Sequence, residues 1–486
     1  MTPLKKLSFL YLVTLVGAFA AILTVLHFGS DLPRAQAAAL VDSGQTAVAA
    51  EPTTALSGLS KTLKANFDHP LGRLFLQLLV VIALAQLAGR AFRRMGQPAV
   101  VGEIVVGILL GPSLLGLLAP QTFAFLFPTD TLGTLHLLSQ VGVCLFMFCV
   151  GMELDAKQVR SNSYVAVAVS HVSIAFPYLL GVLLAYFLFS QFAGAGTTFT
   201  AFALFMGISM SITAFPVLAR ILQDRGMSRT FVGATAMTCA AVDDVTAWTI
   251  LAFVVAVASA SSLTSFSLNV VLILVFIAIM MFGVRRVLPH VLGQDRMNQD
   301  APSPETLAIV VCVVVAASLS TEVIGIHALF GAFLAGAVMP QVAGFRDRIG
   351  ERITAFGSVL LLPLFFVYTG LRTQIGLLEG LEDWSICLLI TAIATLGKLG
   401  GSAAAARFTG MNWRESLQLG ALMNSRGLME LIVLNIGYDL GILSPRIFTM
   451  LVIMAVLTTM MTGPLLTLFS RQKYVIPEHL REHSRT

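Results

Sequence analysis

Apolar stretches of nearly uniform length follow one another along most of this chain. Thirteen of them lie between residues 71 and 470, separated by short polar loops. Each is about 20 residues long, the length at which an α-helix crosses the hydrocarbon core of a bilayer. They fall at residues 71–90, 98–119, 133–152, 163–190, 198–220, 230–260, 266–289, 304–321, 323–341, 354–373, 384–406, 414–437 and 446–470. The pattern predicts an all-α polytopic membrane protein with thirteen spanning helices.

The composition agrees with this prediction. Hydrophobic residues make up 57% of the chain and charged residues 11%, whereas about a quarter of the residues of a soluble globular protein are charged. The five cysteines all lie within apolar stretches and lack metal-ligand spacing, so no disulfide framework is implied. The composition therefore excludes a soluble globular protein and places the chain in a lipid membrane.

Basic residues mark one side of the predicted membrane. The loops after the even-numbered stretches carry only Arg372 and Arg446. The loops after the odd-numbered stretches carry Arg90, Arg93, Arg94, Lys157, Arg160, Arg220, Arg225, Arg229, Arg285, Arg286, Arg296, Arg346, Arg348, Arg352, Arg407, Arg414, Arg471 and Lys473. Cytoplasmic loops are enriched in Lys and Arg, so the odd loops and the C-terminus are predicted to be cytoplasmic. This bias also explains the formal charge of +5 without a nucleic-acid partner.

The N-terminal region admits two interpretations. Lys5 and Lys6 precede an apolar run that ends near Phe28. Its length favours an uncleaved extra helix, because signal peptides usually have an apolar region of about 7–15 residues, yet residues 35–37 (Ala-Gln-Ala) resemble a cleavage site. Residues 1–30 are thus a signal anchor or a signal peptide. Residues 31–67, rich in Ala, Ser and Thr, are predicted to form an extracytoplasmic linker.

Two weak sequence matches suggest an internal repeat. Residues 106–112 in the second stretch resemble 331–340 in the ninth, and residues 145–152 in the third resemble 364–371 in the tenth. Both matches have an offset of seven spans, and an odd offset inverts the second copy. Inverted repeats are typical of secondary transporters, whose binding sites lie where the copies meet. We predict a transmembrane domain at 68–472, with a first repeat at 71–260, a linking helix at 266–289 and a second repeat at 304–470, followed by a short cytoplasmic tail at 473–486.

The repeat relates the fifth span to the twelfth, and both carry helix-breaking residues at membrane depth. Residues 213–216 read Thr-Ala-Phe-Pro, and residues 424–427 read Asn-Ser-Arg-Gly. Proline removes a backbone donor and glycine relaxes the backbone. Broken helices are tolerated at this depth only beside a cavity or inside the protein, where their ends present partial charges. Two broken, crossing helices are therefore expected at the centre of the fold.

Five ionisable side chains lie near the same membrane depth as these breaks. Asp243 and Asp244 interrupt the sixth span, Lys398 the eleventh, and Arg426 and Glu430 the twelfth. Ionisable groups at this depth are costly, by roughly 2.5–3.5 kcal/mol on insertion scales, and mark ion or proton sites. Arg426 and Glu430 are four residues apart and so can form a structural charge pair on one helix face. The two aspartates point about 100° apart, so one of them needs another partner, for which Lys398 is the candidate.

Several of these segments resemble the monovalent cation:proton antiporter 2 family, which includes bacterial sodium/proton antiporters, plant cation/H+ exchangers and the membrane domain of Kef-type systems. The similar segments are Ile212–Arg220, Ala240–Val245, His327–Phe333, Gly397–Lys398 and Asn424–Asn435. The resemblance spans about 70–470 and implies a sodium/proton antiporter-like fold. In that fold a core of spans 4–6 and 11–13 moves against a panel of spans 1–3 and 8–10. It also implies a homodimer in the inner membrane of a bacterium.

The resemblance assigns roles to the polar residues. It implies that Asp244 carries the ion and that Asp243 is the partner of Lys398. Desolvation favours a protonated carboxyl and a nearby cation favours an ionised one, so Asp244 can hold either a proton or Na+/K+. The Thr213 hydroxyl is a second candidate ligand of the metal ion. Plant exchangers usually carry Asn where Asp243 stands, so the choice between Na+ and K+ does not follow from the resemblance.

The sequence thus predicts a secondary active antiporter for protons and a monovalent cation, serving pH and cation homeostasis. We expect no cofactor beyond the transported ions, and no enzymatic activity, because no nucleophile–base pair or metal triad appears at membrane depth. An ion channel or a solute symporter of similar inverted topology is the alternative. A channel would favour ligand rings from several subunits, and the aspartate pair disfavours an anionic solute. Because the chain reaches only Thr486, we expect no regulation through the additional domains that other members carry.

Overall fold

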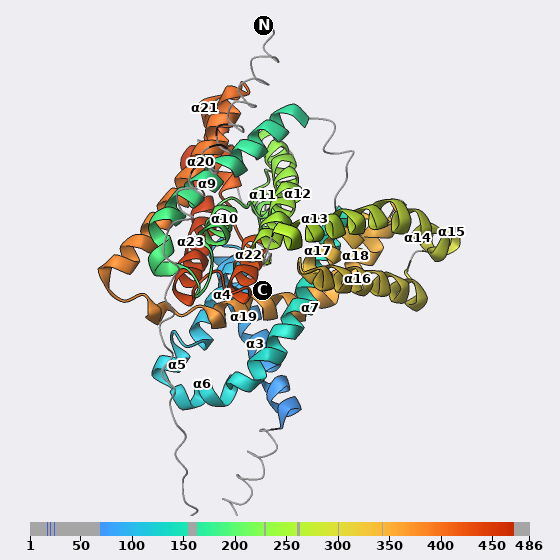
Figure 1. Ribbon diagram of the computed structural model, residues 1–486, viewed down its shortest axis with the longest axis horizontal. Coiled ribbons are helices and arrows are strands. Elements are labelled where there is room, and N and C mark those ends of the chain that lie inside the picture. The colour runs from blue at the N-terminus through green and yellow to red at the C-terminus, as the bar shows by residue number, and fades with distance from the viewer. Residues whose placement is uncertain are drawn as a thin grey trace, which may run out of the picture.

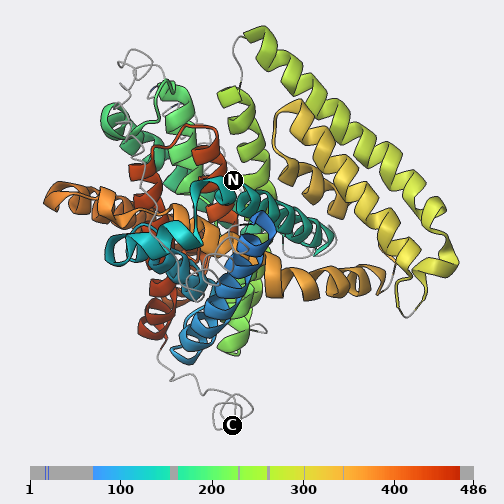
Figure 2. The ribbon, with the colours of Figure 1, turned by 90° about the horizontal axis from the view of Figure 1, so that it is seen from below.

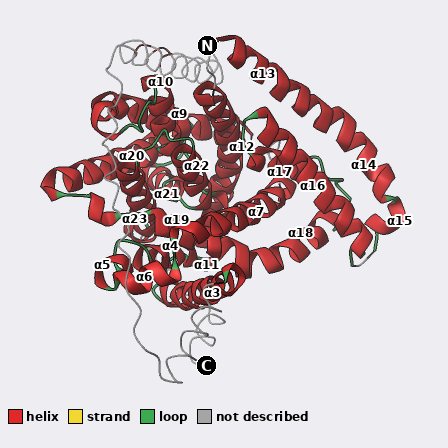
Figure 3. Cartoon of the chain, turned by 60° about the horizontal axis from the view of Figure 1, so that its bottom comes forward, coloured by secondary structure: helices red, strands yellow, loops and turns green. Residues whose placement is uncertain are grey.

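The computed structural model describes residues 69–153, 163–227, 230–259, 263–299, 301–342 and 344–470, together with Gly17, Ala20 and Thr24. Within these residues the fold is all-helical apart from an isolated antiparallel bridge between Ala193 and Leu443 (Figures 1 and 3). The all-α prediction is confirmed. The predicted signal anchor or peptide, the linker and the cytoplasmic tail lie outside the described residues.

The thirteen predicted spans are of two kinds: single long helices, and spans that consist of shorter helices. In the described residues, ten helices are long and apolar enough to cross a membrane. The three remaining spans, the fifth, ninth and twelfth, consist of shorter helices. The fifth forms α10 (Phe199–Ser209) and α11 (Phe215–Asp224), the ninth forms α17 (Ala328–Ala337), and the twelfth forms α21 (Trp413–Met423) and α22 (Leu428–Asp439). The fold therefore has the predicted broken helices in the fifth and twelfth spans.

One group of helices packs into a bundle that we call the panel. It comprises α3 (Pro70–Arg94), α4 (Ala99–Leu110), α7 (Thr129–Glu153), α16 (Pro304–Ile324), α17, α18 (Phe345–Phe356), the π-helical turn Gly357–Leu361 and α19 (Leu362–Arg372). The short helices α5 (Leu115–Leu118) and α6 (Pro120–Leu126) connect α4 to α7.

Glycines allow the panel helices to cross so closely that their backbones are in contact. A Cβ on Gly107 of α4 would lie 2.2 Å from the Val367 carbonyl oxygen of α19, and one on Gly151 of α7 would lie 2.1 Å from the Phe333 carbonyl oxygen of α17. The first crossing joins spans two and ten, and the second joins spans nine and three. The repeat offset of seven exchanges these two crossings, so the panel is built symmetrically from both copies.

The other group of helices forms the core bundle. It comprises α9 (Ser163–Phe192), α10, α11, α12 (Phe231–Ser259), α20 (Gly380–Phe408), α21, α22 and α23 (Pro445–Phe469). Large apolar side chains fill its interior, among them Phe202, Phe205 and Phe448, none of which is exposed. Trp248 of α12 packs against the rings of Phe330 and Phe333 of α17, with centroids 5.2 Å and 5.8 Å away. This aromatic contact joins the core bundle to the panel.

A long apolar segment follows α12, between the two predicted repeats. It runs through α13 (Leu263–Ala278), the π-helical turn Ile279–Val284 and α14 (Arg285–Leu292) to the short helix α15 (Gln294–Met297). Figure 2 shows it along one edge of the molecule, beside α16. Its side chains are largely apolar and exposed, Phe282 by 78%, as expected of a helix that faces lipid. The segment corresponds to the predicted linking helix at 266–289.

The two broken spans meet at their breaks. The backbone N–H of Ala214, between α10 and α11, donates to the carbonyl oxygen of Ser425, between α21 and α22, at 3.0 Å. Pro216 is the second residue of α11, where a missing N–H is tolerated. A Cβ on Gly427 would lie 2.7 Å from Cγ2 of Val217. The proline thus permits one break, and the glycine permits the other break to approach it closely.

Candidate functional site

The polar centre of the fold is built around the crossing of the broken helices. Asp243 and Asp244 reach it from α12, Lys398 from α20, and Arg426 and Glu430 from α22 and the break before it. All five side chains are buried, with at most 2% of any residue exposed. The structure therefore brings together the five ionisable residues that the sequence placed at one depth.

Asp243 is held by four donors. The Oδ1 atom accepts from the Ser170 hydroxyl at 2.5 Å. The Oδ2 atom accepts from Lys398 Nζ at 2.8 Å, from the Thr213 hydroxyl at 2.7 Å and from the Ser173 hydroxyl at 3.3 Å. The Asp243–Lys398 ion pair thus has the partners that the sequence analysis expected. Hydroxyl groups from α9 and from the first break add donors that stabilise the carboxylate.

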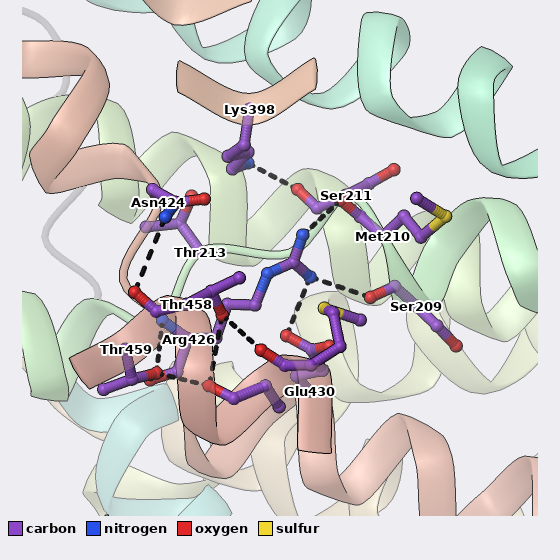
Figure 4. A network of polar contacts seen from close by, with 12 residues as sticks. Ser209, Met210, Ser211, Thr213, Lys398, Asn424, Arg426, Glu430, Thr458 and Thr459 are labelled. Atoms are coloured by element: carbon purple, nitrogen blue, oxygen red, sulfur yellow. Dashed lines mark hydrogen bonds and ion pairs between the residues drawn. The ribbon is translucent and has the colours of Figure 1, made fainter. Parts of the chain in front are cut away.

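Lys398 also binds the broken backbone of the fifth span. Its ammonium group donates to the Ser173 carbonyl oxygen at 3.1 Å, to the Ser173 hydroxyl at 3.0 Å and to the carbonyl oxygen of Ser211. Ser211 follows the C-terminus of α10, where the helix dipole is negative. The lysine therefore ties Asp243 to α9 and to the first break. Figure 4 shows its contact with Ser211 at that break.

The face of α12 that carries Asp244 differs from the face that carries Asp243. Trp248 lies four residues after Asp244 and so shares its face, and Trp248 packs on Phe330 and Phe333 of the panel helix α17. Asp243 faces α9 and α20 inside the core bundle. Asp244 is therefore turned toward the boundary between core and panel.

Arg426 and Glu430 form the predicted charge pair, with Nη1 of Arg426 2.8 Å from Oε2 of Glu430. The same guanidinium group donates to the carbonyl oxygens of Ser209 at 2.9 Å and Met210 at 2.8 Å, at the end of α10. Figure 4 shows the arginine reaching from one broken helix to the other. Arg426 thus stabilises the negative C-terminal end of α10, and Glu430 balances its charge.

The Thr213 hydroxyl contacts both Asp243 and the end of α21. It lies 2.7 Å from Asp243 Oδ2 and 2.9 Å from the carbonyl oxygen of Met423, which ends α21. It therefore links the first break to both Asp243 and the second broken helix. The role of Thr213 as a ligand of a cation at Asp244 stays a prediction.

The formal charges of the cluster do not cancel. When all five groups are ionised, three carboxylates and two cations sum to −1. Buried charge without compensation is strongly unfavourable. A single proton or a single monovalent cation would bring the sum to zero, so the cluster can take up either one, but not both, at no net charge.

Sequence reasoning missed Ser170 and Ser173 of α9. Both are fully buried and bind Asp243. Their spacing of three places two hydroxyls on one face of an apolar span, and this pattern was the available signal. Thr459 of α23 was also missed; its hydroxyl donates to the Arg426 carbonyl oxygen at 2.8 Å and accepts from the Arg426 N–H at 3.2 Å. This hydroxyl replaces backbone hydrogen bonds that the second break removes.

The chain is similar to known transport proteins over most of its length. The family model described as sodium/hydrogen exchanger, transmembrane, matches residues 79–471. A relative named Na(+)/H(+) antiporter NhaS4, from Synechocystis sp., is 42% identical over 403 residues, which cover 83% of this chain and 97% of the relative. Cation/H(+) antiporter 17 of Arabidopsis thaliana is 38% identical over 82% of this chain. K(+)/H(+) antiporter 1 of Saccharomyces cerevisiae is 30% identical over 84% of it.

The length of the match differs among these relatives. The aligned part covers 48% of the plant protein and 48% of the yeast protein. Among solved structures, the sodium proton antiporter MjNhaP1 from Methanocaldococcus jannaschii has the same fold, with a TM-score of 0.56 over 81% of this chain and 96% of that chain. At 14% sequence identity, this likeness concerns the fold alone.

Proposed function

The chain belongs to the sodium/hydrogen exchanger family, and on this premise we propose that it exchanges protons for a monovalent cation, Na+ or K+, by competition at Asp244. The observation that carries the proposal is the buried cluster of three carboxylates and two cations, whose charges sum to −1. As long as the Asp243–Lys398 pair stays ionised, one proton or one monovalent cation brings the charge of this cluster to zero. Because each ion excludes the other, the site can reorient from one side of the membrane to the other only when it holds one of them. This condition is the requirement for antiport.

The position of Asp244 supports alternating access. The residue lies on the face of α12 that meets the panel, whereas its neighbour Asp243 is anchored within the core bundle. Movement of the core against the panel would expose Asp244 to one side of the membrane and then to the other. Asp243, Lys398 and the Arg426–Glu430 pair would travel with the core and keep the crossing intact.

The ligands that we propose for the cation are oxygen atoms. Asp244 supplies a carboxylate, and the breaks of the fifth and twelfth spans supply carbonyl oxygens that lie outside helices. Oxygen ligands suit hard monovalent cations better than nitrogen or sulfur ligands do. We propose no cofactor besides the transported ions and no enzymatic step. The relatives named above are antiporters, which supports antiport over a channel or a symporter.

Flux through reconstituted vesicles tests the proposed function. We expect that adding Na+ or K+ to vesicles with an imposed pH gradient makes the gradient collapse, because each entering cation displaces a proton. A pH-sensitive dye inside the vesicles reports the change, and Li+ and Rb+ complete the ranking of cations. Empty vesicles are the control. A membrane potential that drives cation flux without any proton movement would instead indicate a channel.

We propose that the C-terminus and the odd-numbered loops are cytoplasmic, so cysteine labelling should report opposite sides for two loops. A cysteine at Ala195, which is exposed between α9 and α10, should react with an impermeant maleimide added outside whole cells. A cysteine at Arg286, exposed in α14, should react only after the cells are opened. Gly194 is unsuitable, because its Cβ would lie 1.8 Å from the Gly441 carbonyl oxygen. The background should lack Cys312, which is exposed.

The reverse labelling pattern would overturn the orientation that the loop charges predict. We also propose a homodimer through the panel in a bacterial inner membrane, as the family resemblance implies. Chemical cross-linking in native membranes, followed by gel electrophoresis, tests the dimer.

A further inference from the structure

A second charged cluster lies at the boundary between core and panel, away from the ion site. Arg372, the last residue of α19 in the panel, places Nη1 2.6 Å from Oδ1 of Asp439, the last residue of α22 in the core. The same atom donates to the Asn435 side-chain oxygen at 3.1 Å. Its guanidinium carbon lies 4.8 Å from the ring of Tyr368 and 4.9 Å from the ring of Tyr438. The guanidinium group of Arg372, on the panel, thus contacts Asn435, Tyr438 and Asp439 of the core.

The other oxygen of Asp439 is bound by a different panel helix. Nε2 of His136, on α7, lies 3.3 Å from Asp439 Oδ2. The imidazole ring stacks on Tyr368, with centroids 5.1 Å apart and an interplanar angle of 9°. The Gln140 side-chain amide nitrogen lies 2.9 Å from the same Nε2 atom. Asp439 therefore joins the core to two helices of the panel, and one of the two contacts gains a charge only when His136 is protonated.

Protons can reach this cluster from the aqueous phase. The side chains of His136, Asp439 and Arg372 are 25%, 23% and 17% exposed. Asp439 of α22 and Tyr368 of α19 contact His136, and Arg372 of α19 binds the same Asp439 carboxylate. His327, before α17, interacts electrostatically with His136, with Asp439 and with Glu322 of α16. Asp439 is the carboxylate in contact with the imidazole. Protonation of His136 therefore adds an attraction between panel and core.

The opposite end of the same boundary carries a groove, beside which the Gln97 side chain of the panel donates to the Met460 carbonyl oxygen of α23 at 3.5 Å. The groove has a volume of about 700 Å³ and is lined by Gln97, Arg225, Gly463 and Thr467 among others. α23 begins six residues after Asp439 and reaches Gly463 and Thr467 near its other end. The groove and Asp439 therefore lie at opposite ends of the boundary between core and panel, which we call its two mouths. The groove separates core from panel at one mouth, and the Asp439 cluster closes the other.

We propose that His136, Asp439 and Arg372 form a proton-responsive latch that holds core and panel together at the mouth near Asp439. The latch rests on the proposed antiport, because it regulates how often the ion site opens to that side. With His136 neutral, Arg372 is the only charged partner of Asp439 in these contacts, because the imidazole then offers at most an uncharged hydrogen bond, and the mouth opens more readily. With His136 protonated, Asp439 is bound from both panel helices, and the mouth stays closed for longer.

The latch predicts opposite effects of two substitutions at His136. His136→Gln removes the titration and should exchange cations faster than the native protein at pH 5.5, by roughly threefold to fivefold, the factor that a partly exposed ion pair contributes. At pH 8 the two proteins should be equal. His136→Arg carries a permanent charge and should match the native protein at pH 5.5 but fall below it, by a similar factor, at pH 8. This range spans the pH at which histidines usually titrate.

The measurement is exchange of isotopically labelled cation at equal pH on both sides of the vesicles. At each pH the variant rate is divided by the native rate. This ratio corrects for the pH dependence that proton competition at Asp244 causes in all the proteins. His290→Gln, an exposed histidine of α14, is the matched control and should give a ratio of one throughout. Asp439→Asn removes the negative charge that attracts the protonated imidazole and should lose the acid-dependent slowing, as His136→Gln does.

The outcomes separate the latch from the proposed function. If the native protein exchanged no ions, the proposed antiport itself would be wrong. Active native protein, together with ratios near one for both His136 variants and for Asp439→Asn at every pH, would overturn the latch. Fluorescence-detected gel filtration identifies a variant that fails to fold, and the remaining two substitutions then decide the question.

Discussion

Replacing Asp244 by asparagine should abolish the exchange of protons for cations and leave the protein folded. Asparagine keeps the shape of the side chain but cannot take up or release a proton. The cluster then contains two carboxylates and two cations, whose charges cancel without any transported ion. Dye-reported proton movement in reconstituted vesicles should fall to the level of empty vesicles with every cation tested.

A second buried aspartate provides the matched control. Asp383 of α20 is fully buried and binds Arg446 of α23, outside the cluster at the broken helices. Asp383→Asn should lower the temperature of denaturation in detergent because it breaks this pair, yet it should retain exchange. If Asp244→Asn still moved protons in response to cations, Asp244 would not be the carrier.

Much of the fold could be predicted because apolar length and helix breakers are local signals. The thirteen spans follow from stretches of spanning length, and the broken fifth and twelfth spans follow from residues around Pro216 and Gly427. The pairing of Asp243 with Lys398 was also accessible, since buried ionisable groups in a membrane need partners. These inferences depend on residue type and depth rather than on detailed packing.

The missing parts of the site depend on tertiary packing. Serines are common in membrane helices, so Ser170 and Ser173 became recognisable only when α9 was seen against Asp243. The pairing of Arg426 with Glu430 follows from their spacing of four, but its contacts with the carbonyl oxygens at the end of α10 require the two breaks to cross. Thr213 likewise contacts Asp243 because of the path that the chain takes through the first break.

The Asp439 cluster shows the same limit at the boundary between the bundles. His136 appears in the sequence as one of several polar residues within the third span, more than 300 residues before Asp439. Arg372 was noticed only as an exception to the loop charges. Their contact arises because α7, α19 and α22 end at the same mouth. Sequence separation conceals such clusters, and only the packing of core against panel brings them together.

The remaining large effect concerns the charge that each transport cycle moves. Asp243 accepts from the hydroxyls of Ser170 and Thr213, at 2.5 and 2.7 Å, as well as from Lys398. These hydroxyls bind both carboxylate oxygens independently of the lysine, so Asp243 keeps hydrogen-bond donors if the lysine is neutral. If Lys398 gives up a proton when the cation binds, two protons are exchanged for one cation. We therefore expect cation jumps to produce a sustained current in recordings on solid-supported membranes.

Neutralising the pair should separate current from flux. In the double variant Asp243→Asn with Lys398→Gln, Asp244 remains and can still exchange one proton for one cation, so dye-reported exchange should persist while the current disappears. Glutamine keeps amide donors near the Ser173 and Ser211 carbonyl oxygens, which Lys398 binds in the native protein. Native protein that exchanges ions without current would show that the Asp243–Lys398 pair stays intact throughout the cycle. In that case a single proton crosses for each cation, and the lysine serves only to hold the broken fifth span against α9.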